Sequence, residues 1–153
     1  MCYNKRNSSQ LFFHYLIKNE TYIVIHGKQV MMTRIKVLIV EDDAVIANIE
    51  KWRLLKLGYE LCGSAENGAD ALSSVENLKP DIVLMDIGLK GDIDGIETAG
   101  RIKKNFNIPV IFVSSNIDEA TISRAREIQP DGFIKKPFDD DDLRIAIELG
   151  IKK

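Results

Sequence analysis

The stretch that decides the fold is IVLMDIGLKGDIDG, which runs from Ile82 to Gly95. Its first four residues are apolar and partly β-branched, as in a strand buried on both faces, and the run ends on one carboxylate, Asp86. The following residues indicate a loop that leads into a helix, because they include the glycines Gly88, Gly91 and Gly95. We therefore expect Asp86 at the C-terminal tip of a central strand, although aspartate is also common there as a turn or helix-capping residue.

Three other apolar runs end on polar residues in the same way. Residues 35–40 lead into Glu41, Asp42 and Asp43, residues 110–113 lead into Ser114 and Ser115, and residues 133–134 lead into Lys135, Lys136 and Pro137. In a parallel sheet these tips share one edge, which is where open α/β folds bind their ligands. The polar residues at the four tips thus form a candidate functional site.

From Arg34 onward, strand-like runs alternate with helical patterns of about a dozen residues, which is typical of βαβ units. This alternation predicts a doubly wound α/β fold with a five-stranded parallel sheet and five helices. The expected strands are 35–40, 59–65, 82–86, 108–114 and 132–135, and the expected helices are 44–57, 69–78, 96–106, 119–128 and 140–149. In the first helix, the residues expected to face inward are Ile46, Ile49 and Leu54 or Leu57.

Residues 1–33 do not continue this pattern, since they mix polar clusters with apolar patches. We expect a weakly ordered extension; an extra hairpin, or a true start of translation at Met31 or Met32, remain open alternatives. The domain itself is expected over 34–151, and no effector domain is expected beside it.

Composition excludes several classes of function. The chain has 153 residues and a net charge of −2, so it lacks the basic surface of a nucleic-acid binder. The apolar stretch 11–25 is interrupted by polar residues, so we expect no membrane segment. Two cysteines without CxxC spacing fit a cytoplasmic protein. Both histidines, His14 and His26, lie outside the patterned region, which argues against a histidine general base in the domain.

Glu41, Asp42 and Asp86 would bring three carboxylates to neighbouring strand tips. Two unit charges about 4 Å apart repel by roughly 4 kcal/mol at an effective dielectric near 20, so such a cluster requires a cation or raised pKa values. Oxygen ligands without cysteine or histidine favour Mg²⁺. Lys136 would add a positive charge and Ser114 a hydroxyl donor, and together these groups suit transfer of a phosphoryl group onto a carboxylate.

The segments LIVEDDA at 38–44, PDIVLMDIGLKGDIDGIE at 80–97, PVIFVSS at 109–115 and GFIKKPF at 132–138 resemble the receiver domain of two-component response regulators. The resemblance covers about 118 residues. It implies a flavodoxin-like sheet of strand order 2-1-3-4-5, which is the order of the chemotaxis receiver. It also implies that the protein is a single-domain response regulator of a two-component or phosphorelay signalling system. Such a domain is a phosphoacceptor and not an enzyme.

By resemblance, Asp86 would be the phosphoacceptor. Asp42 would bind Mg²⁺ directly, whereas Glu41 would act on the ion largely through water. The backbone carbonyl of Gly88 would be a further ligand. The other implied roles belong to Ser114 as the phosphoryl-binding hydroxyl, Lys136 as its paired lysine, and Phe133 as the aromatic switch, with a cis bond at Lys136-Pro137. Lys90, Ser115 and Phe133 depart from the commonest family residues, without removing a reacting group.

The implied partners are a sensor histidine kinase or a histidine-phosphotransfer protein, and a downstream protein that binds the fourth helix, fifth strand and fifth helix. A homodimer is left open. The closest alternative function is an intermediate phosphorelay carrier that passes its phosphoryl group to a histidine-phosphotransfer protein. A flavodoxin-like FMN carrier is disfavoured because three acids follow the first strand, and a haloacid-dehalogenase phosphatase is disfavoured because Gly88 stands where its second aspartate is needed.

Overall fold

A computed structural model describes residues 34–115 and 118–151 in full and, before them, the backbone of residues 3–4, 13–17, 20–25 and 28–32. Contacts divide the chain into two units, Met1–Arg34 and Ile35–Lys153. Each unit is described by itself below.

The first unit contains an antiparallel sheet. Its strands are β1 (Tyr3–Asn4), β2 (Phe13–Ile17), β3 (Glu20–Ile25) and β4 (Lys28–Met32), paired in that order. In register, Phe13 lies opposite Val24 and Thr21 lies opposite Met32. The remainder of 1–33 lies outside the described residues, so the expectation of a weakly ordered extension or a later start stays a prediction.

The second unit is built on a parallel sheet of five strands. The strands are β5 (Lys36–Val40), β6 (Glu60–Ala65), β7 (Ile82–Met85), β8 (Val110–Ser114) and β9 (Gly132–Lys135). Their spatial order is β6-β5-β7-β8-β9, and every neighbouring pair is parallel. Numbered within this unit, the order is 2-1-3-4-5, so the expected doubly wound fold is confirmed. The central strand β7 is buried along its whole length, as its apolar run predicts.

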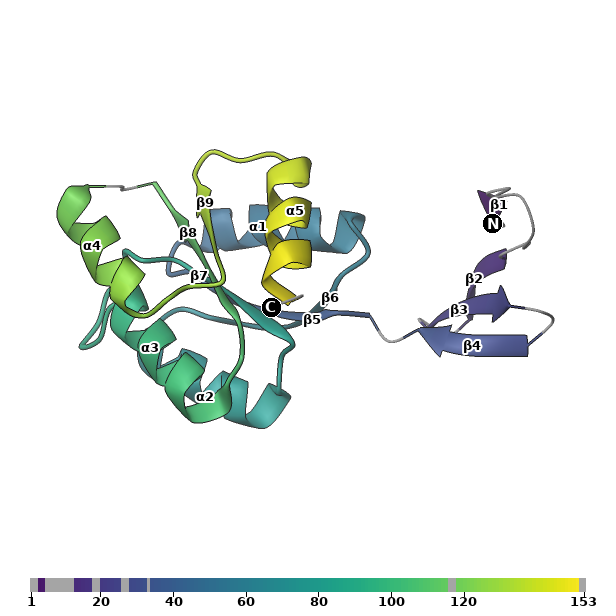
Figure 1. The fold of residues 1–153 in the computed structure, drawn as a ribbon, viewed down its shortest axis with the longest axis horizontal. Helices are drawn as coiled ribbons and strands as arrows, with labels where there is room; N and C mark the ends of the chain where they lie inside the picture. Colours follow the sequence, from purple (N-terminus) through teal and green to yellow (C-terminus); the bar gives the residue numbers. More distant parts are fainter. Residues whose placement is uncertain are drawn as a thin grey trace. The chain divides into compact units, whose positions relative to one another are not determined.

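Four helices connect these strands, a fifth follows the last strand, and together they cover both faces of the sheet (Figure 1). They are α1 (Ala44–Lys56), α2 (Gly68–Leu78), α3 (Gly95–Phe106), α4 (Glu119–Glu127) and α5 (Asp140–Ile151). One core packs α2, α3 and α4 against the sheet, and the other packs α1 and α5 against the opposite face. No helix in the described part of the chain is both long and apolar enough to cross a membrane.

The rotation of α1 about its axis differs from the sequence-based expectation. Ile49 was expected to face inward, but it is half exposed, and Glu50 is buried instead. Leu54 is fully buried as expected, and a spacing of four residues sets Glu50 and Leu54 on one side of the helix. The expectation for Ile49 was wrong because apolar residues occur all around α1, so periodicity alone does not choose the buried side.

Candidate functional site

Asp86 follows directly after β7, at the tip of the central strand. Its backbone N–H donates to the carbonyl of Val40, which ties the tip of β7 to the end of β5. The loop after Asp86 closes on Gly95, the first residue of α3. A Cβ on Gly95 would lie 1.9 Å from the carbonyl oxygen of Asp86, so only glycine lets α3 begin this close to the strand tip.

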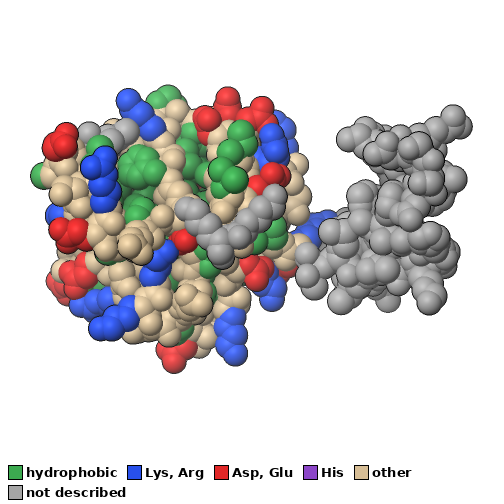
Figure 2. All heavy atoms as spheres, in the orientation of Figure 1, with side chains coloured by type: hydrophobic (Ala, Val, Ile, Leu, Met, Phe, Trp, Pro, Cys, Tyr) green, Lys and Arg blue, Asp and Glu red, His purple; other side chains and the backbone are tan. Residues whose placement is uncertain are grey.

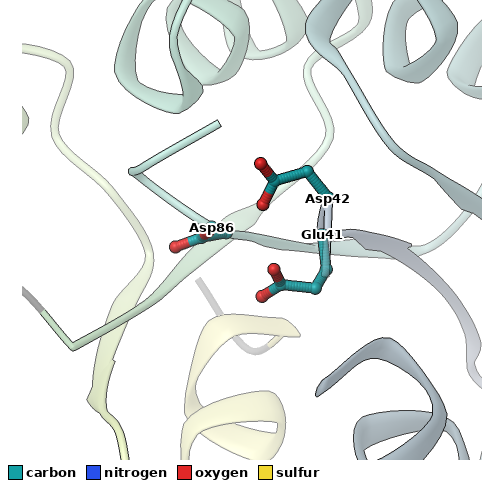
Figure 3. Close-up of side chains that lie close together, drawn as sticks. All are labelled: Glu41, Asp42 and Asp86. Carbon is teal, nitrogen blue, oxygen red and sulfur yellow. The ribbon is translucent and has the colours of Figure 1, made fainter. Parts of the chain in front are cut away.

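Three carboxylates meet at this edge of the sheet. Glu41 and Asp42 extend from the end of β5 and Asp86 from the end of β7, and one oxygen of each lies within 4.8 Å of the others (Figure 3). Glu41 is buried, whereas Asp42 and Asp86 are partly exposed. The donor set consists of oxygen atoms alone and carries up to three negative charges, so it fits a hard divalent cation such as Mg²⁺.

Lys136 brings a positive charge to the same edge. It follows β9, and its backbone N–H donates to the carbonyl of Ser114, which holds it beside the end of β8. Its ammonium lies 2.5 Å from a carboxylate oxygen of Glu41 and 3.8 Å from one of Asp86. The bond between Lys136 and Pro137 is cis, as the sequence resemblance implied.

The electrostatics of this cluster follow from burial and charge. Burial raises the pKa of Glu41, while the hydrogen bonds from Lys136 and from the N–H of Asp43 oppose this shift. Burial alone would lower the pKa of Lys136, but its hydrogen bond to Glu41 and the nearby Asp86 outweigh burial and raise it. Lys136 therefore stays charged, and it is the cation that Glu41 and Asp86 share.

Ser114 and Phe133 lie on the same face of neighbouring strands. Ser114 is the last residue of β8 and is buried. Phe133 of β9 lies opposite Phe112, which precedes Ser114 by two residues on β8. Residues two apart on a strand share a face, so Phe133 lies diagonally beside Ser114. The rings of Phe133 and Phe112 form an edge-to-face pair with centroids 6.5 Å apart, and 39% of Phe133 is exposed.

Two loop residues border the carboxylates. The N–H of Gly88 donates to a carboxylate oxygen of Asp86 at 3.3 Å, and a Cβ at Gly88 would lie 3.8 Å from one Asp86 carboxylate oxygen and 4.0 Å from the other. Lys90 is 92% exposed, and its ammonium lies 3.9 Å from Asp42. The loop thus leaves the exposed side of Asp86 open at Gly88.

One acidic residue near this edge was missed in the sequence. Glu50 on α1 is 2% exposed, and Lys136, Glu41 and Asp86 all act on its charge. The signal was present, because Glu50 stands four residues after Ile46 and four before Leu54 on an otherwise apolar stripe. A charged residue on the buried stripe of a helix is uncommon enough to single out.

Comparison with known proteins identifies the family. The family model of the response regulator receiver domain matches residues 37–148. The chain belongs to this family. The receiver domain is 34% identical over 118 residues to the transcriptional regulatory protein PdtaR of Mycobacterium tuberculosis, covering 77% of this chain and 57% of that protein. It is also 34% identical to the transcriptional regulatory protein KdpE of Staphylococcus aureus, covering 74% of this chain and 48% of that one.

A solved structure shows the same receiver fold. The signal receiver domain of a modulated diguanylate cyclase from Desulfovibrio desulfuricans superposes with a TM-score of 0.76 at 40% identity, covering 78% of this chain and 95% of that one. Receiver domains are signalling domains that interact with histidine kinases and generally depend on Mg²⁺. This chain spans about half the length of the two regulatory proteins it matches.

Proposed function

We propose that this receiver domain accepts a phosphoryl group on Asp86 from the phosphohistidine of a sensor kinase, in a Mg²⁺-dependent reaction, and signals through a phosphorylation-dependent protein interaction. The convergence of Glu41, Asp42 and Asp86 within 4.8 Å, with the Lys136 ammonium 3.8 Å from Asp86, carries this proposal. Catalysis of phosphoryl transfer is mostly a matter of positioning and charge neutralisation, and these side chains supply both.

In the proposed reaction, a carboxylate oxygen of Asp86 attacks the phosphorus atom. The bond from phosphorus to the donor imidazole nitrogen breaks, and that nitrogen keeps the electron pair. Lys136 pairs with the phosphoryl oxygens, and the Ser114 hydroxyl donates to one of them. A Mg²⁺ ion held by Glu41, Asp42, Asp86 and the Gly88 carbonyl would supply further charge neutralisation.

The proposal is tested by phosphorylation with acetyl phosphate, read by the mobility of the phosphoprotein. We expect rapid, Mg²⁺-dependent modification of the wild-type chain and none in Asp86→Asn. Asp92→Asn is the matched control, because it makes the same change at an exposed position of the same loop. Modification that persists in Asp86→Asn, or that chelation of Mg²⁺ leaves unchanged, would contradict the proposal.

An exposed apolar stripe on α1 supports a protein as the phosphodonor. Val45, Ile49 and Trp52 are 69%, 50% and 61% exposed and follow one another at helical spacing. The stripe begins in the first turn of α1, two residues after the N-cap Asp43 and three after Asp42 of the carboxylate cluster. A donor helix packed along this stripe would have its histidine near Asp86.

A second apolar surface supports an output through α4, β9 and α5. Phe133, Ile145 and Leu149 are 39%, 48% and 58% exposed, and they line one cavity between β9 and α5. Figure 2 shows hydrophobic side chains at the surface over α5 and beside α4. If phosphorylation moves Phe133, this surface changes, and a partner that prefers one form can report it.

A relay role differs from an output role in where the phosphoryl group goes next. Incubation of the labelled domain with candidate histidine-phosphotransfer proteins distinguishes the two. Retention of label on Asp86 supports the proposed output role, and rapid transfer to a histidine supports the relay.

A further inference from the structure

Glu50 is a buried acid that the packing of α1 does not explain. Its side chain is 2% exposed, and its Oε1 is the one fully buried side-chain oxygen or nitrogen in the described residues without a hydrogen-bond partner. A carboxyl group in such a place is costly as an anion, because the protein replaces none of the hydrogen bonds that water gave it. An apolar residue would fill this position on α1 more favourably, so the carboxyl group requires a reason.

The charges that act on Glu50 all belong to the candidate site. Lys136 favours its ionised form, while Glu41 and Asp86 disfavour it. Asp140, the first residue of α5, is instead paired with Arg53 and Lys56 of α1. In the described part of the chain no hydrogen bond or ion pair joins Glu50 to the site, so Glu50 acts on the site through its charge.

Burial is the largest cause that raises the pKa of Glu50, and with the neighbouring charges the pKa is about 7. Glu50 therefore exchanges its proton near neutrality. When it is neutral, the Lys136 ammonium is shared by Glu41 and Asp86 alone. When it is ionised, its charge attracts the Lys136 ammonium and repels any negative charge added at Asp86.

We propose that Glu50 is a positioning residue of the phosphoryl-transfer site: a buried carboxyl group without a hydrogen-bond partner at its Oε1, whose charge determines how readily Lys136 pairs with a phosphoryl group on Asp86. The inference rests on the proposed function. Phosphorylation adds negative charge at Asp86, whose charge already disfavours the ionised form of Glu50, so the protonated form of Glu50 favours the phosphorylated domain. By linkage, ionisation of Glu50 disfavours phosphorylation by the same factor.

The first experiment compares phosphorylation rates with acetyl phosphate at saturating Mg²⁺ between pH 6 and pH 8.5. Glu50→Gln holds the position permanently neutral, and Glu50→Leu does so without a polar atom. We expect both variants to match the wild type at pH 6 and to exceed it by about three- to tenfold at pH 8.5, because at that pH the wild type alone carries a negative charge at position 50. Parallel profiles of the wild type and both variants would overturn the inference.

The second experiment needs no phosphorylation, so its failure differs from a failure of the proposed function. Carboxyl carbon NMR follows the ionisation of Glu50, with the resonance assigned by its loss in Glu50→Gln. We expect a midpoint near neutral pH that rises in Lys136→Met and stays unchanged in the control Lys135→Met, whose side chain is exposed. A midpoint near the ordinary glutamate value, or one that Lys136→Met leaves unmoved, would show that Glu50 is not coupled to the site.

Discussion

The ammonium of Lys136 lies 2.5 Å from a carboxylate oxygen of Glu41, although 95 residues separate the two in the chain. The same ammonium is 3.8 Å from Asp86, the proposed phosphoacceptor. In this structure Lys136 is therefore bound to Glu41, a neighbour of the proposed phosphoacceptor. It can transfer to a phosphoryl group on Asp86 by a short movement, and Glu41 is the carboxylate that it leaves.

Lys136→Met is expected to destabilise the fold, because it leaves the buried Glu41 without its cation. The loss should be about 3 kcal/mol in the free energy of unfolding, as for other broken buried pairs. Urea unfolding at pH 7.5 without Mg²⁺ measures it. Lys135→Met, an exposed neighbour, should change the free energy by less than about 0.5 kcal/mol. Equal stability of the two variants would mean that the pair with Glu41 contributes nothing.

Glu50→Leu is expected to change how stability depends on pH. In the folded chain the pKa of Glu50 is about 7, above its ordinary value of 4.5. The folded state thus holds a proton that the unfolded state has released between these values, so wild-type stability falls as pH rises from 4.5 to 7. Urea unfolding measures the free energy of unfolding of Glu50→Leu minus that of the wild type. This difference should be about 3 kcal/mol larger at pH 8 than at pH 4. A constant difference between pH 4 and pH 8 would contradict a raised pKa.

Substitution of Gly88 is expected to lengthen the life of the phosphorylated state. A Cβ at this position would lie in ordinary contact with the Asp86 carboxylate, so a longer side chain would cover the approach of water. Gly88→Ala should change the dephosphorylation rate little, and Gly88→Met should slow it severalfold. Loss of label after removal of the donor measures both rates. If Gly88→Met loses its label as fast as Gly88→Ala, water access is controlled elsewhere.

Ser114 and Phe133 are expected to act together as the switch. Movement of the Ser114 hydroxyl towards a phosphoryl group would free space on the face that it shares with Phe133, and the half-exposed ring could enter it. NMR should show the ring of Phe133 gaining contacts with β8, and the amides of α4 shifting, when the wild-type domain is loaded with beryllofluoride. A hundredfold preference of a partner for this form would correspond to about 2.7 kcal/mol.

The controls for this switch are single alanine variants. Ser114→Ala should lose the ring movement and the α4 shifts. Leu78→Ala should keep both, because it removes an apolar side chain on α2 that is as exposed as Phe133 but lies outside the proposed switch. Full α4 shifts in Ser114→Ala and in Phe133→Ala would show that the signal leaves through the loop of residues 87–94.

Trp52→Ala is expected to impair transfer from a protein donor and to spare transfer from a small one. Trp52 is the largest side chain of the exposed stripe on α1, and it does not line the carboxylate cluster. Its loss should slow transfer from a phosphorylated sensor kinase about tenfold, because one buried aromatic contributes a kilocalorie or more to binding. The rate with acetyl phosphate serves as the internal control. An equal decrease with both donors would instead indicate damage to the fold.

The sequence by itself determined the sheet and the edge that bears the candidate site. Asp86, Glu41 and Ser114 each follow a buried apolar run, and parallel strands place such ends together whatever the helices do. Asp43 could likewise be predicted as the N-cap of α1, and its side chain accepts from the N–H groups of Val45 and Ile46. These features depend on residues close together in the chain, which local pattern describes well.

Only the tertiary structure decided how α1 is rotated and how Lys136 is paired. Ile49 and Glu50 are neighbours in the sequence, and an α1 with apolar residues on several sides permits either to be buried; packing against the sheet and α5 selects Glu50. Lys136 pairs with Glu41 more closely than with Asp86 because its ammonium lies about an ångström nearer to the Glu41 carboxylate, and this difference depends on how three strand tips are placed in space. Burial and Coulomb energies depend on these distances in space, which no spacing along the chain contains.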